Sequence, residues 1–110
     1  MNFISTRHLV RAAWLVVPLA ALAPQAQASD ALAKRYGCVA CHQADKKVVG
    51  PAWKDVAGKY KGTVTPAQLA ASIKKGSSGK WGPIPMPPQG QVSDADLADL
   101  AAWVLEGGQP

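Results

Sequence analysis

Both cysteines of this 110-residue chain lie in one short motif, Cys38-Val39-Ala40-Cys41-His42. This C-x-x-C-H spacing is the pattern at which a c-type haem is attached covalently. The spacing has a physical basis, because thiols one turn apart can reach the two vinyl groups on one edge of a porphyrin, and the adjacent imidazole is brought over the iron as its proximal ligand. The motif therefore predicts one haem c, bound through two thioether bonds.

The first 28 residues have the features of a secretory signal peptide. Arg7 and Arg11 precede an apolar run over residues 12–23, and small residues follow at the expected cleavage site. An uncleaved membrane anchor is the alternative, but the run contains Pro18 and is shorter than the roughly 20 apolar residues that a spanning helix needs. We therefore expect cleavage after residue 28, export to the periplasm, and no membrane span in the mature chain.

The mature chain, residues 29–110, has 82 residues, which is room for one small domain. Domains this short usually need a disulfide, a metal or a cofactor to be stable. Ten basic residues against seven acidic ones give the mature chain a net charge of +3, and its lysines are spread along the sequence. A nucleic-acid binder usually has a denser basic stripe, so we expect no nucleic-acid partner.

Other interpretations of the cysteine pair require features that this sequence provides poorly. A structural zinc site needs four nitrogen or sulfur ligands, and the mature chain supplies only Cys38, Cys41 and His42. A thioredoxin-like redox pair usually lies in a βαβ unit, and the sequence has no strand pattern. A plain disulfide between Cys38 and Cys41 is the remaining alternative in an oxidising compartment.

Helix signals and prolines predict an all-α domain of about four short helices. We expect these helices over residues 31–36, 52–60, 65–76 and 93–108. Capping residues predict three of the starts: Ser29 or Asp30 for the first helix, Thr65 for the third, and Ser93 with Asp96 as a capping box for the fourth. Four prolines within residues 76–91 predict a constrained loop before the last helix.

Met86 is the only methionine after the first residue, and it lies in the stretch GPIPMPP, residues 82–88. A methionine is often core filler, but filler does not require a proline on each side. Fixed φ angles at these prolines reduce the freedom lost when the sulfur is placed on iron. The alternative, a polyproline ligand for an SH3-like groove, is disfavoured by export. We therefore expect Met86 to be the sixth ligand.

Ligation of the iron by His42 and Met86 predicts one-electron exchange. A thioether ligand raises the reduction potential relative to two basic nitrogens, and filling both axial positions closes the iron to substrates. The sequence therefore predicts an exported carrier that cycles Fe(III)/Fe(II), and not an enzyme. The alternative is a haem enzyme or gas sensor in which Met86 dissociates, but the mature chain has no second histidine to assist a bound ligand.

Four stretches together resemble the short bacterial monohaem class I cytochromes c, most closely the cytochrome c-551 group. They are GCVACH, VGPAWKDVA, IKKGSSGKWGPIPMPP and WVLEGG, in the order and approximate spacing of that group. The resemblance implies the small class I cytochrome c fold, wrapped around one covalently attached haem, with a proline-rich ligand loop. It also implies thioether bonds at Cys38 and Cys41 and axial ligation by His42 and Met86.

The same resemblance implies roles for residues around the haem. The Pro51 carbonyl is expected to contact the His42 imidazole and to orient it. The Trp81 indole is similar to one that donates a hydrogen bond to a haem propionate. Ser72 is a departure, because relatives can carry a basic residue there, and a propionate salt bridge from this position is absent in this chain.

The resemblance further implies redox protein partners for a monomeric carrier. We expect a quinol–cytochrome c oxidoreductase as electron donor and a nitrite reductase or terminal oxidase as acceptor. An apolar patch is expected around the haem edge, made of Val39, Val48, Val49, Ile84, Pro85 and Pro87. Lysines expected at its rim, Lys34, Lys46, Lys47 and Lys80, would attract an acidic partner.

Overall fold

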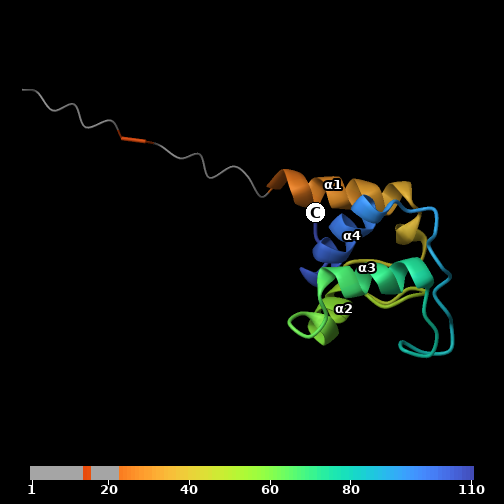
Figure 1. Ribbon diagram of the computed structural model, residues 1–110. Helices are drawn as coiled ribbons and strands as arrows, with labels where there is room; N and C mark the ends of the chain where they lie inside the picture. Colours follow the sequence, from red (N-terminus) through yellow and green to blue (C-terminus); the bar gives the residue numbers. More distant parts are fainter. Residues whose placement is uncertain (1–13, 16–22) are drawn as a thin grey trace, which may run out of the picture.

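The computed structural model describes residues 14–15 and 23–110. The described residues form no strand, and their helices are α1 (Ala23–Arg35), the 3-10 helix η1 (Cys38–Ala40), α2 (Trp53–Tyr60), α3 (Pro66–Lys75) and α4 (Asp94–Leu105). α4 packs against α1, α2 and α3 (Figure 1). The predicted all-α fold with about four short helices is confirmed. Within this part of the chain, no helix combines the length and apolar character that crossing a bilayer requires.

The first helix begins earlier than the sequence predicted. α1 starts at Ala23, so the expected cap at Ser29 or Asp30 is wrong for the full-length chain. Alanine and glutamine, both good helix formers, fill most of residues 23–28, and the one proline there falls in the first turn, where a missing N–H is tolerated. Most of the predicted signal peptide, residues 1–28, lies outside the described residues, so its cleavage stays a prediction.

The hydrophobic core is organised by α4. Six residues of this helix are buried: Leu97, Leu100, Ala101, Trp103, Val104 and Leu105. They meet Ala33 of α1, Val56 of α2 and Leu69 of α3 in one cluster. Full burial of a leucine or valine side chain contributes roughly 1.5–3 kcal/mol, so α4 holds the other helices in place.

Side-chain caps start α3 and α4, but only one forms a complete box. Thr65 and Gln68 exchange two hydrogen bonds of 3.2 and 2.9 Å, which satisfy two N–H groups at the start of α3. At α4, the Asp96 N–H donates to the Ser93 hydroxyl oxygen at 3.1 Å. The reciprocal half of the predicted box is wrong, because the Asp96 carboxylate accepts a hydrogen bond from the Tyr36 hydroxyl at 2.6 Å instead.

The hydrogen bond between Tyr36 and Asp96 joins the residue after α1 to the first turn of α4, across 60 positions of sequence. It raises the pKa of the Tyr36 hydroxyl, first because ionisation would lose this bond, and further through partial burial and the negative charge of Asp96. Tyr36 immediately precedes Gly37 and the cysteine motif. The bond therefore fixes the point at which the chain leaves α1 and enters the motif.

A double-mutant cycle of Tyr36→Phe and Asp96→Ala should give a favourable coupling free energy in denaturant unfolding of the haem-loaded protein, because each single variant removes the same hydrogen bond. The folded pKa of Tyr36 lies above its unfolded value near 10, so this contribution is complete below about pH 10 and is lost as pH rises through the raised pKa. The Tyr36→Phe variant should lack that alkaline loss. A coupling near zero at pH 7 would contradict the assignment.

Candidate haem site

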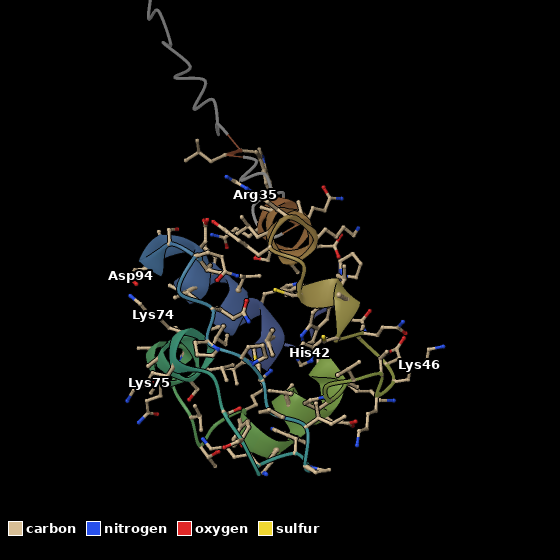
Figure 2. All side chains as sticks on the ribbon, turned by 90° about the vertical axis from the view of Figure 1, so that its right-hand side faces the viewer. Arg35, His42, Lys46, Lys74, Lys75 and Asp94 are labelled. Carbon is tan, nitrogen blue, oxygen red and sulfur yellow. The ribbon has the colours of Figure 1, made fainter. Side chains whose placement is uncertain are left out.

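The helices and two loops of the described domain surround a cavity of about 250 Å³. Cys38, Cys41, His42 and Met86 all line it, although they come from two distant segments of the sequence. Much of the remaining wall is apolar and includes Val49, Val56, Val64, Leu69, Ile73, Leu100 and Val104. His42 lies toward the middle of the domain, whereas Lys46, Lys74 and Lys75 lie at its periphery (Figure 2).

The cysteine motif folds as a tight turn directly after α1. Gly37 adopts a left-handed conformation with φ 75°, which redirects the chain into η1. The N–H groups of Cys41 and His42 then donate to the Cys38 carbonyl at 3.2 and 3.0 Å. Both cysteines are free, with Cys38 half-buried and Cys41 exposed. Burial raises the pKa of the Cys38 thiol, so the protonated thiol is favoured there.

The His42 ring is held by the backbone that follows it. Its Nδ1 lies 2.8 Å from the Pro51 carbonyl oxygen. A carbonyl can only accept, so Nδ1 carries the proton and donates. This tautomer leaves the Nε2 lone pair available to a metal. The contact expected between Pro51 and His42 is therefore present in the fold.

Gly50 belongs to the site, although the sequence alone did not predict a role for it. It precedes Pro51 in a Gly-Pro pair. A Cβ at this position would lie 2.5 Å from His42 Cε1 and 2.9 Å from Nδ1, distances that real side chains do not reach. The Gly50 N–H also donates to the Cys41 carbonyl at 2.8 Å. The backbone thus passes directly against the imidazole, and only glycine permits this approach.

Met86 is placed by backbone contacts on both sides of the proline-rich loop. Ser77 and Met86 exchange two backbone hydrogen bonds of 3.0 and 2.8 Å, and the Gln89 N–H donates to the Lys74 carbonyl at the end of α3. Gly76, with φ 75°, sits where a Cβ would be 2.6 Å from the Met86 carbonyl oxygen. Gly76 therefore both ends α3, as its sequence position predicts, and makes room for the loop.

Trp81 and Ser72 lie in the same cavity wall. Trp81 is half-buried; its ring meets the Tyr60 ring edge to face at 6.0 Å, and Lys59 Nζ lies 4.6 Å from its centroid. Ser72 also lines the wall, and its side chain is neutral.

The residues at this cavity fit a haem. Two free thiols, an imidazole with an available nitrogen and a thioether meet in one largely apolar enclosure. Among the described residues, no group of three or more histidine, cysteine, aspartate or glutamate side chains is arranged to hold a metal ion directly. The donor set therefore suits an iron supplied inside a porphyrin.

Gly50→Ala should lower the free energy of unfolding of the haem-loaded protein by about 1–3 kcal/mol, because its methyl group overlaps the His42 ring. Gly58→Ala is the matched control: this glycine is exposed in α2, and its Cβ would meet nothing within 4 Å. The control should raise stability by about 0.5–1 kcal/mol, because alanine favours the helix. Equal effects of the two substitutions would show that the ring is free to move.

Comparison with known proteins agrees with this site. The sequence model described as cytochrome c matches residues 26–107 of the chain. Cytochrome c-552 of Nitrosomonas europaea is 52% identical over 100 residues, which cover 87% of this chain and 97% of that protein. Cytochrome c-551 of Pseudomonas aeruginosa is 56% identical over 81 residues, covering 73% and 77%.

The fold agrees as well. The crystal structure of the wild-type Nitrosomonas europaea cytochrome c552 matches with a TM-score of 0.66 and 57% identity, over 69% of this chain and 95% of that one. With this match, the chain belongs to the cytochrome c family: it is a small class I cytochrome c of the bacterial type, with haem c attached through its two cysteines, and it is an electron carrier and not an enzyme.

Proposed function

We propose that the protein carries single electrons with His42 and Met86 as the two axial ligands of its haem iron, and that Cys38 and Cys41 form the thioethers. The haem supplies an iron that cycles between Fe(III) and Fe(II). The observation that carries this proposal is the convergence of all four side chains on one cavity. Met86 is the only methionine among the described residues, and its backbone is fixed to Ser77.

The protein's own residues would keep the two ligands in place. The Pro51 carbonyl holds the His42 ring in one tautomer and orientation. At the start of the loop, Gly76 packs closely against the Met86 backbone, and Ser77 forms two backbone hydrogen bonds with it. Filling both axial positions leaves no site for a substrate, which suits transfer of electrons without bond making.

Trp81 is proposed to donate its indole N–H to a haem propionate. Trp81 lines the cavity, and its side chain is half-buried there. Lys59 Nζ above the ring adds a positive charge at this part of the wall. A donor together with a nearby cation would favour an ionised carboxylate.

We further propose that residues 1–28 are cleaved and that the mature protein acts in the periplasm. Its proposed donor is a quinol–cytochrome c oxidoreductase, and its proposed acceptor is a nitrite reductase or a terminal oxidase. Both would dock on the apolar patch predicted from the sequence. In support, Val39, Val48, Val49 and Ile84 are large apolar side chains with 42–61% of their surface exposed.

The lysines proposed for the rim of the patch differ in their surroundings. Lys34 lies in an ion pair with Asp30 at 2.6 Å, so its charge is partly compensated. Lys46 and Lys47 are exposed beside the patch residues Val48 and Val49, and neither is in an ion pair within the described part of the chain. Lys80 is also exposed and in none of these ion pairs, so Lys46, Lys47 and Lys80 are better candidates than Lys34 for attracting an acidic partner.

Met86→Ala should convert the low-spin ferric spectrum to a high-spin one and abolish the charge-transfer band between ferric iron and methionine sulfur. The absorption spectrum of the purified exported protein measures both. Pro83→Ala is the control, because Pro83 is exposed in the same loop and does not line the cavity; it should keep the band. A high-spin spectrum in the unmodified protein would overturn the methionine ligation and favour the haem enzyme or gas sensor.

Lys47→Glu should slow bimolecular electron transfer to the partner by roughly tenfold at low ionic strength, with the difference shrinking as salt is added. Lys75→Glu makes the same change in net charge at the end of α3, on the opposite side of the domain from Lys46 (Figure 2), and should have a smaller effect. Stopped-flow rates over a range of salt concentrations measure both. If the two variants slowed electron transfer equally, Lys47 would act only through the net charge of the protein, and its proposed role at the docking surface would be wrong.

A further inference from the structure

Three aromatic residues of the cavity wall, His42, Trp53 and Trp103, form a row of rings. The Trp53 indole stacks on the His42 imidazole, with ring centroids 6.0 Å apart and planes inclined by 19°. Trp103 meets Trp53 on edge, with centroids 4.7 Å apart and planes at 61°. Both tryptophans are buried, with 7% of their surface exposed. Offset and edge-to-face pairs at these separations are attractive and directional, so the position of Trp53 constrains the His42 ring.

The C-terminal tail, residues 107–110, packs against both tryptophans of this row. Gly108 is buried against Trp53, and a Cβ there would lie 2.7 Å from the Trp53 atoms Cβ and Cε3. The Trp103 Nε1–H donates to the Gln109 carbonyl at 2.6 Å. The Gln109 side-chain amide donates to Asp45 at 3.2 Å, in the loop that follows His42.

The chain that follows His42 is also tied to α2. The N–H groups of Trp53 and Lys54 donate to the carbonyls of Gln43 and Ala44 at 2.9 and 3.1 Å. Trp53 therefore fixes the His42 segment through its backbone and the ring through its indole. The tail contacts both Trp53 and the loop at Asp45, so two independent contacts connect it to the same segment.

We propose that Trp53 and the C-terminal tail are positioning elements for the His42 imidazole. This inference rests on the proposed role of His42 as an axial ligand. The tail holds the Trp53 indole against the His42 imidazole. The indole in turn keeps the imidazole in the orientation in which its Nδ1–H donates to the Pro51 carbonyl. That hydrogen bond raises the basicity of a ligating imidazole. A weaker hydrogen bond makes the imidazole less basic, so it would stabilise ferric iron less than in the unmodified protein. Disturbing the tail should therefore raise the reduction potential.

Two adjacent glycines provide a matched test. Gly108→Ala places a methyl group in the Trp53 ring, whereas Gly107→Ala meets nothing within 4 Å. Both glycines have positive φ, 63° and 102°, so both substitutions strain the backbone and only the first also displaces Trp53. Deletion of Gln109 and Pro110 is a second variant that removes exposed residues and, with them, the contacts to Trp103 and Asp45.

The measurement is solvent exchange of the His42 Nδ1 proton, followed by nitrogen-edited NMR of the ferrous haem-loaded protein, together with the reduction potential and the free energy of unfolding. Gly108→Ala and the deletion should accelerate exchange by roughly tenfold and shift the potential upward. Gly107→Ala should leave both near their original values despite its loss of stability. If Gly108→Ala does not fold, the deletion variant decides alone.

The outcomes separate this inference from the proposed function. If exchange and potential change only in proportion to the free energy of unfolding, and Gly107→Ala behaves like the other variants, the tail has no positioning role and the inference is overturned. If the His42 ring proton of the unmodified ferrous protein lacks the strong haem ring-current shift of an axial ligand, the ligand assignment fails, and both are overturned.

Discussion

The packing of α4 against the three other helices is the contact on which the rest of the structure depends. Each partner helix ends or begins at a segment of the haem site. α1 leads through Tyr36 into the cysteine motif, α2 starts at Trp53 behind His42, and α3 ends at Gly76 beside Met86. Because the haem segments have little regular structure of their own, their relative positions follow from how these helix ends are arranged around α4.

Close approaches of the backbone make the site rigid where the ligands are held. Gly50 touches the His42 ring, and Gly76 touches the Met86 carbonyl, each at a distance that excludes a side chain. The hydrogen bond that His42 donates to the Pro51 carbonyl fixes the ring, and the two backbone hydrogen bonds between Ser77 and Met86 fix the loop. A site held by packed neighbours and hydrogen bonds keeps its geometry through a reaction. For an electron carrier, this means that the two proposed ligands, His42 and Met86, need not rearrange when the charge on the iron changes.

Local signals in the sequence predicted much of this structure. The cysteine motif, the four helices, the Thr65 cap and the proline-rich loop each depend on residues close together in the chain, and each is present. The start of α1 differs because alanine and glutamine fill most of residues 23–28 and the one proline there falls in the first turn, so the helix extends to the N-terminal side of the expected cap.

The missed features of the site depend on contacts between distant residues. Nothing in the sequence around Trp53 indicates that its indole stacks on His42 or that Gly108 packs against it. Asp96 matches the acidic position of a capping box, but its partner is Tyr36, 60 residues away. The Gly-Pro pair at residues 50–51 is the one local signal that could have drawn attention to Gly50, because a glycine before a conformationally restricted residue often marks a close backbone approach.

The cavity also explains why a domain of this size needs a covalent cofactor. Without the haem, the apolar side chains that line this cavity of about 250 Å³ would lose their packing partner, and full burial of one valine or leucine side chain is worth roughly 1.5–3 kcal/mol. The whole folding free energy of a small domain is about 5–15 kcal/mol. A group that binds only the folded chain stabilises it according to its concentration, and thioether bonds keep the haem at the site regardless of the surrounding concentration. The loops over residues 43–52 and 76–92 contain no α-helix, and they can remain irregular because the haem supplies the apolar surface against which they pack.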